Sequence, residues 1–159
     1  MSESLKALFD SLPQVGRVTW IAIRPERKVP MIELEKVIAF AGKGLSGDRY
    51  NSKNGKRQVT LVQAEHLATI GSLLGRDAIA PSLLRRNIAV SGINLLALKD
   101  KQFQIGECIL EYTGLCHPCS AMETTFGPGG YNAVRGHGGI TARIIQGGEI
   151  KLQDSVQAI

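Results

Sequence analysis

The chain has 159 residues, of which 43% are hydrophobic, 5% aromatic and 21% charged. This length fits one domain with a continuous apolar core, and this composition argues against a disordered protein. Every apolar run falls well short of the roughly 20 residues that span a bilayer. The N-terminus has no basic segment followed by a long apolar one, so we expect no secretory signal and a cytoplasmic protein.

The formal net charge is +5. Such an excess could serve nucleic acid, but aromatic residues are sparse and no basic block exceeds three residues. A compact anionic small molecule accounts for the charge equally well. We therefore expect a small-molecule ligand, with no nucleic-acid partner and no membrane association.

The first segment, residues 1–14, is predicted to be a helical extension of a single domain that covers residues 1–159. Leu5, Leu8, Phe9 and Leu12 share one helical face, and Ser2 or Ser4 can cap the helix before Pro13 ends it. We expect this face to pack against the domain core.

From Gly16 onward, short runs with β-type patterns dominate. We expect strands over 18–23, 31–37, 58–62, 87–90, 103–105, 108–113, 141–145 and 149–152. Short helices are expected over 64–74, 81–85 and 120–125, with a glycine-rich loop over 42–49 and a hairpin turn at Gly147-Gly148. Many short strands with few helices predict a mostly β fold with small helices, either a barrel or a sandwich, without repeats or linkers.

The segment Cys116-His117-Pro118-Cys119 lies where a predicted strand opens into a predicted helix. A thiolate at a helix N-terminus is stabilised by unpaired backbone N–H groups, which is typical of a reactive or ligating cysteine. Four interpretations stay open: a dithiol redox site, structural zinc with His117 or His137, a single thiolate ligand or persulfide carrier, and ordinary buried thiols. Three cysteines, with Cys108 alone in a strand, are too few for a disulfide scaffold.

Two glycine-rich loops, 127–130 and 136–139, flank Arg135, and Arg143 follows. Glycines such as Gly138 and Gly139 let backbone N–H groups approach an anion, and arginine suits phosphate. Ordinary loops with solvated arginines are the alternative.

Further polar residues precede two predicted strands. Arg85, Arg86 and Asn87 precede one strand, and Arg57 precedes another, so these residues could hold a phosphate and a pterin edge or could simply be solvated. Three other groups have simpler expected roles. Asp48 and Arg49 are expected to form an internal ion pair, His66 is expected to be a solvated or capping residue, and Glu123 is expected to lie on the surface.

Taken together, these segments resemble the MOSC family, the domain that ends molybdenum cofactor sulfurases. The likeness runs over roughly Gly16 to Val156, and its specificity comes from the order and spacing of the matches. The matching segments are Gly47-Asp48-Arg49, 57–61 with Glu65, 84–88, Ile105-Gly106, 114–119 with Met122-Glu123, 136–143 and Gly147-Gly148.

The resemblance implies a MOSC-type β-barrel that binds the molybdenum cofactor (molybdopterin). It also implies that one cysteine, which corresponds best to Cys119, bonds molybdenum or carries sulfur, and that Arg86 and Asn87 contact the cofactor. The full set of expected cofactor-binding residues is Arg57, Arg85, Arg86, Asn87, Cys116, His117, Arg135, Gly138, Gly139 and Arg143.

The chain departs from the family's amidoxime-reducing members, which have an arginine where this chain has Pro118 and carry an additional N-terminal β domain. We find no desulfurase portion with its pyridoxal-phosphate lysine, so pyridoxal phosphate binding is expected of the family only. The chain is not expected to extract sulfur from cysteine by itself.

The leading hypothesis is an oxidoreductase subunit in which Cys119 is both catalytic residue and metal ligand, and which reduces N-hydroxylated substrates. No dinucleotide motif appears in the sequence, so electrons would come from a separate flavin or iron–sulfur protein. The alternatives are a persulfide or cofactor carrier without turnover of its own, and a zinc-stabilised interaction domain.

Overall fold

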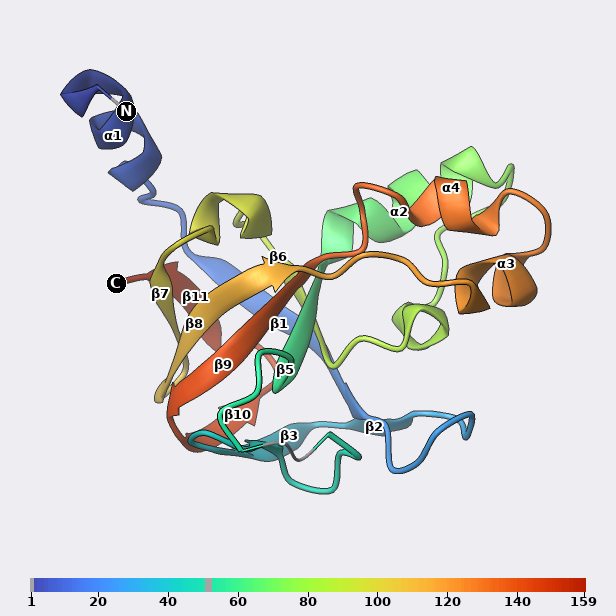
Figure 1. The fold of residues 1–159 in the computed structure, drawn as a ribbon, viewed down its shortest axis with the longest axis horizontal. Coiled ribbons are helices and arrows are strands. Elements are labelled where there is room, and N and C mark those ends of the chain that lie inside the picture. The colour runs from blue at the N-terminus through green and yellow to red at the C-terminus, as the bar shows by residue number, and fades with distance from the viewer. Residues whose placement is uncertain (1, 51–52) are drawn as a thin grey trace.

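The computed structural model describes residues 2–50 and 53–159, and most of them form or surround a β-barrel (Figure 1). The strands are β1 (Gly16–Ile23), β2 (Ile32–Leu34), β3 (Lys36–Phe40), β4 (Gly44–Leu45), β5 (Val59–Gln63), β6 (Ile88–Ser91), β7 (Gln102–Ile105), β8 (Cys108–Leu115), β9 (Ile140–Gln146), β10 (Gly148–Lys151) and β11 (Ser155–Ala158). The helices are α1 (Glu3–Asp10), α2 (Ala64–Leu73), α3 (Ala121–Phe126) and α4 (Gly130–Val134), with 3-10 turns η1 (Pro81–Leu84) and η2 (Leu95–Leu98).

The main sheet closes on itself. Its strand order is β11-β7-β8-β9-β5-β6-β1-β2, and β11 also pairs with β1, so seven strands form a closed barrel with β2 as an appended edge. Closure leaves the seven strands without free edges. The predicted mostly β fold with small helices is thus confirmed, and it is a barrel. The pair β5–β6 is parallel, with α2 in the connection between the two strands.

A second, three-stranded sheet with the order β10-β3-β4 lies beside the barrel. The strand pairings of this sheet show that two of the sequence-based predictions were wrong. The single strand expected over 31–37 is interrupted at Glu35, because β2 pairs with β1 in the barrel whereas β3 pairs with β10. The hairpin expected at Gly147-Gly148 is wrong: β9 stays in the barrel, and the chain turns so that β10 pairs with β3 instead.

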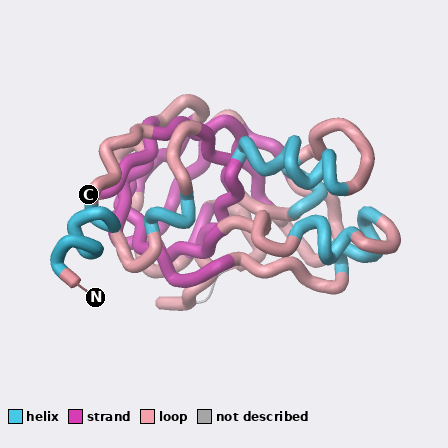
Figure 2. Tube along the Cα trace, turned by 90° about the horizontal axis from the view of Figure 1, so that it is seen from above, coloured by secondary structure: helices cyan, strands magenta, loops and turns pink. Residues whose placement is uncertain are grey.

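Residues of β5 and β6 face two different apolar clusters. Leu61, Ile88 and Val90 belong to the barrel core, whereas Val62 and Ala89 belong to a second cluster with residues of α2, α3 and α4. The alternation follows from the two-residue period of a strand, whose successive side chains point to opposite faces. Figure 2 shows these helices grouped beyond one end of the barrel.

The N-terminal helix forms as predicted but does not pack as predicted. The Ser2 side chain accepts a hydrogen bond from Leu5 N and caps α1. No residue of α1 is buried, and Leu8 and Phe9 are 71% and 57% exposed. Only Leu12, beyond the helix, packs against the core, so the expected packing of the whole apolar face is wrong. In Figures 1 and 2, α1 lies at the opposite end of the molecule from α3 and α4. Within 2–50 and 53–159, we find no helix with the length and apolar character needed to traverse a bilayer.

Candidate functional site

A cavity of about 330 Å³ opens between the end of β8 and the glycine loop that follows α4. Its lining combines a thiol, an imidazole, a guanidinium and glycine backbone, which together can hold an anionic ligand with a soft metal. The lining residues are Leu115, Cys116, His117, Pro118, Tyr131, Arg135, Gly136, Gly138 and Gly139.

Cys116 lies at the base of this site. Its residue is 1% exposed, and its backbone N–H donates to the carbonyl oxygen of Gly139 at 2.8 Å. The Nη2 of Arg57 lies 3.6 Å from Cys116 Sγ, within the range of a hydrogen bond to sulfur. Arg57 therefore places a permanent positive charge beside this thiol, as an anionic sulfur or ligand would require.

Arg86 lies behind the cavity and holds its two walls together. Its Nε donates to Gly138 O at 2.8 Å and its Nη1 to Leu84 O at 2.8 Å, while its Nη2 donates to the carbonyls of Cys116 and His117 at 3.3 and 3.4 Å. Burial lowers the pKa of Arg86, but a guanidinium remains charged even so. Arg86, which was predicted to contact the cofactor, therefore donates its hydrogen bonds to backbone carbonyls of the protein.

The loop 136–139 packs closely against neighbouring backbone at two positions where only glycine fits, Gly138 and Gly139. A Cβ on Gly138 would overlap the carbonyl oxygen of Cys116, and a Cβ on Gly139 would overlap that of Leu61. Gly139 also has a φ of +88°, which favours glycine. The backbone of Gly138 and Gly139 therefore lies close to the cavity, as expected, and the packing of the fold requires glycine at both positions.

Cys119 is exposed and lies just outside the lining residues of the cavity. Its carbonyl oxygen accepts a hydrogen bond from Met122 N at the start of α3. All three cysteines are free thiols. Within the described residues, no three histidine, cysteine or acidic side chains are grouped to hold a metal ion, and His137 faces His66 instead of the cysteines. The alternative of a structural zinc site therefore has no ligand set here.

Asn87 lies inside the wall of the barrel and does not face the cavity. The residue is 0% exposed; its Oδ1 accepts from Thr60 N and Oγ1, and its Nδ2 donates to Ala22 O and to Asp48 Oδ1. Direct contact between Asn87 and a ligand would require this network to open. In this conformation the amide supports the strands β1, β5 and β6.

Asp48 is the acidic centre of the same network. Its carboxylate accepts from Arg24 N at 2.7 Å and from Arg24 Nη2 at 3.2 Å, and its side chain is fully buried. The internal ion pair expected with Arg49 is therefore formed with Arg24. The sequence offered no signal for this partner, because Arg24 and Asp48 are 24 positions apart and three strands lie between them.

Two predicted arginines point elsewhere. Arg85, in left-handed conformation after η1, donates to Val29 O at 2.6 Å and to Glu26 O at 3.3 Å in the loop after β1. Arg143 forms an ion pair with Glu111 across β8 and β9 at 3.2 Å. Neither side chain lines the cavity, so any contact of theirs with a bound ligand stays a prediction.

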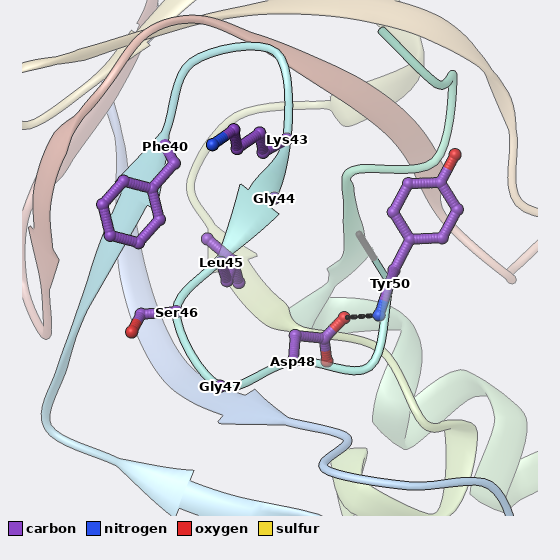
Figure 3. A pocket seen from close by; sticks show the side chains of 8 residues that line it. All are labelled: Phe40, Lys43, Gly44, Leu45, Ser46, Gly47, Asp48 and Tyr50. Atoms are coloured by element: carbon purple, nitrogen blue, oxygen red, sulfur yellow. Dashed lines mark hydrogen bonds between the residues drawn. The ribbon is translucent and has the colours of Figure 1, made fainter. Parts of the chain in front are cut away.

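A second cavity, of about 290 Å³, lies over β4 and the loop after it (Figure 3). The view shows Tyr50 beside Asp48, whose Oδ2 accepts from Tyr50 N at 3.3 Å. The hydroxyl of Tyr50 in turn accepts from Arg57 N at 3.4 Å. Since Arg57 also contacts Cys116, this chain of contacts links the glycine-rich loop 42–49 to the cysteine site.

The family model described as the MOSC domain matches residues 36–157, which is most of the chain. The chain belongs to the MOSC family. This family is associated with the molybdenum cofactor. The match includes the whole cysteine segment, both glycine loops and every residue predicted to bind the cofactor.

Solved MOSC-type structures have the same fold at low sequence identity. The YuaD protein from Bacillus subtilis superimposes with a TM-score of 0.81 at 18% identity, over 92% of this chain and 97% of that one. YiiM from Escherichia coli superimposes with a TM-score of 0.69 at 16% identity, over 90% of this chain and 69% of that one. YiiM from Geobacillus stearothermophilus superimposes with a TM-score of 0.70 at 14% identity, over 91% of this chain and 75% of that one. No curated protein matches the sequence significantly.

Within the MOSC domain, the structure gathers half of the expected cofactor-binding residues at one cavity: Cys116, His117, Arg135, Gly138 and Gly139. Arg57 and Arg86 contact this group from behind. Sequence reasoning missed Tyr131, a lining residue that comes from an unpredicted helix of five residues. Glu123 is exposed as expected but also caps α4, and hydrogen bonds from Tyr131 N and Gly129 N lower its pKa.

Proposed function

We propose that this protein binds the molybdenum cofactor at the cavity beside Cys116 and serves as the substrate-reducing subunit of an oxidoreductase. The observation that carries the proposal is that Cys116, Arg135 and the glycine loop line one cavity, with Arg57 in contact with Cys116 and the exposed Cys119 next to the lining segment in the chain. The cavity of about 330 Å³ lies within the usual range for small-molecule sites, near its lower end. Thiolate is a soft donor that suits a high-valent metal bound to sulfur.

In this proposal Cys119 is the sulfur ligand and the catalytic residue. Its exposure leaves the Sγ atom accessible to a ligand that occupies the opening. Arg135 would neutralise the phosphate of a pterin ligand, and the backbone of Gly138 and Gly139 would lie against it. Arg57 would hold the second thiol, Cys116, and the negative charge next to it.

The proposed substrates are N-hydroxylated bases, reduced with loss of oxygen as water. When bound, the molybdenum cofactor supplies the two-electron redox chemistry, and the protein supplies position and electrostatics. Electrons would come from a separate flavin or iron–sulfur protein. The proposal assigns the protein to the cytoplasm, where free thiols such as these three stay reduced.

The test is to purify the protein from a host that makes the cofactor, measure molybdenum and pterin per chain, and assay an N-hydroxylated base with a chemically reduced dye as electron donor. Stoichiometric molybdenum together with turnover is the expected result. Molybdenum that exchanges without turnover, or a trappable persulfide on Cys119, would instead establish the second candidate, a carrier. The exposure of Cys119 is the observation that keeps this second candidate open.

A further inference from the structure

Two histidines from distant parts of the chain meet behind the glycine loop. His66 lies in the first turn of α2, and His137 lies in the loop after α4. Their Nδ1 atoms are 3.4 Å apart, and the ring centroids are 4.7 Å apart with the ring planes at 82°. The nitrogens are closer together than the centroids, so the Nδ1 atoms lie on the side where the two rings approach each other. The sequence-based expectation of a solvated or capping His66 does not describe this arrangement.

The separation of the two nitrogens is long for a hydrogen bond and suits a shared metal ion. A typical N–H donor lies about 2.7–3.2 Å from its acceptor. Two nitrogens bound to one tetrahedral zinc ion at about 2.0–2.1 Å lie about 3.3–3.4 Å apart. The observed 3.4 Å between the Nδ1 atoms agrees with the second value.

We propose that His66 and His137 form a binding site for a divalent transition-metal ion such as Zn²⁺, with Nδ1 of each ring as the protein ligands and water in the remaining positions. Both side chains are half-buried. His66, though not His137, also lines an open cavity of about 380 Å³, so solvent reaches this side of the pair. The site is separate from the cysteines and does not rest on the proposed function.

The neighbouring carboxylate of Glu65 is already engaged. Its Oε1 accepts from Gln63 Nε2 at 2.7 Å, and its Oε2 accepts from Gly92 N at 3.0 Å. In the described part of the chain, no third acidic, cysteine or histidine side chain completes a metal cluster. The ion would therefore keep open coordination positions, which is typical of an exchangeable ion and not of a structural one.

A bound ion would connect α2 to the wall of the cysteine cavity. His137 is followed directly by Gly138 and Gly139, which line this cavity and contact the Cys116 segment. Because the ion binds only the folded arrangement of the two rings, it stabilises that arrangement. We therefore expect zinc to raise the thermal unfolding temperature and to restrict motion of the loop 136–139.

The test is calorimetric titration of the full chain with Zn²⁺ at neutral pH. The background is a Cys116→Ser, Cys119→Ser chain, so that thiols do not bind the ion. We expect one ion per chain on this background, with affinity at least about tenfold weaker after either His66→Gln or His137→Gln. His117→Gln, which changes the third histidine of the chain, is the matched control and should leave the affinity unchanged.

Circular dichroism without metal checks that each variant folds, and the visible spectrum of Co²⁺ on the Cys116→Ser, Cys119→Ser chain provides a second, spectroscopic measurement. Bands of nitrogen and oxygen coordination without a thiolate charge-transfer band are the expected result. Zinc affinity that stays at the level of the cysteine-free background in the His66→Gln or the His137→Gln variant would overturn the proposal. So would loss of all binding on the cysteine-free background.

Discussion

The Nε of Arg86 lies 2.8 Å from the carbonyl oxygen of Gly138, and this bond joins the start of β6 to the glycine loop of the candidate site. The same guanidinium reaches the carbonyls of Cys116 and His117, on the opposite wall of the cavity. One buried side chain therefore sets the spacing between the two walls. Its role in this structure is to position the site, whatever the ligand.

Replacement of Arg86 by alanine should destabilise the protein by at least about 3 kcal/mol, because several buried carbonyls lose their donor at once. Arg86→Lys should be intermediate, since an ammonium group keeps the charge but cannot reproduce the planar fork. Urea denaturation measures both. Arg135→Ala is the control: among the described residues its exposed guanidinium bonds only the nearby Asn132, so the change should stay within about 0.5 kcal/mol. Equal effects of the two alanine variants would contradict this role.

Gly139→Ala should destabilise the fold far more than Gly136→Ala. Both residues have positive φ, +88° and +81°, so both variants incur a similar backbone cost of about 1–2 kcal/mol. Only Gly139 also has a neighbour, the Leu61 carbonyl, that a Cβ would overlap, while nothing lies within 4 Å of a Cβ at Gly136. Thermal unfolding of the two variants isolates the contribution of the close approach. Similar losses in both would show that backbone conformation alone requires glycine here.

Asp48→Ala should lower the free energy of unfolding by about 3–5 kcal/mol, because it leaves Arg24 and the Asn87 amide without their buried acceptor. Chemical denaturation provides the measurement. Asp10→Ala is a suitable control, since its ion pairs with Lys6 and Lys101 are solvent-exposed and such pairs contribute little. If Asp48→Ala were as stable as the control, the network around Asn87 would have no part in holding the barrel.

Thiol alkylation at neutral pH should label Cys119 first and leave Cys108 unlabelled in the native protein. Cys119 is exposed, whereas Cys108 is buried in β8, and burial raises the pKa of Cys108 to about 11. A thiol with such a pKa carries almost no thiolate at pH 7, and thiolate is the reactive species. Mass spectrometry of peptides after brief treatment with iodoacetamide gives the order. Early labelling of Cys108 would contradict the burial described here.

Local sequence patterns predicted most of the barrel. The short β-type runs that became β1, β5 and β8 and the capping serine of α1 were all predictable, because they depend on neighbours in the chain. Pairing between distant segments was not readable in this way. The run over 31–37 has a β-type pattern that predicts one strand, yet Glu35 separates two strands that join different sheets. Likewise, Gly147-Gly148 has the composition of a hairpin, but the partner of β10 is β3.

The candidate site was predictable in its residue types but not in its division of roles. Arginine and glycine beside cysteine indicated an anion site, and the cavity gathers Cys116, Arg135 and Gly139. The sequence could not show whether an arginine contacts a ligand or, like Arg86, donates to backbone carbonyls, because an arginine in either role can stand shortly before a strand. The facing of His66 and His137 had no local signal, since 71 residues separate them.

The most direct test of the account is the molybdenum and pterin content per chain of three proteins made in a host that synthesises the cofactor: wild type, Cys119→Ala and Cys116→Ala. The account predicts that wild type and Cys116→Ala retain the metal and that Cys119→Ala loses it. Full retention in Cys119→Ala would contradict the assignment of this sulfur as the ligand. Equal loss in both variants would contradict it as well, because the two thiols would then act as one dithiol site.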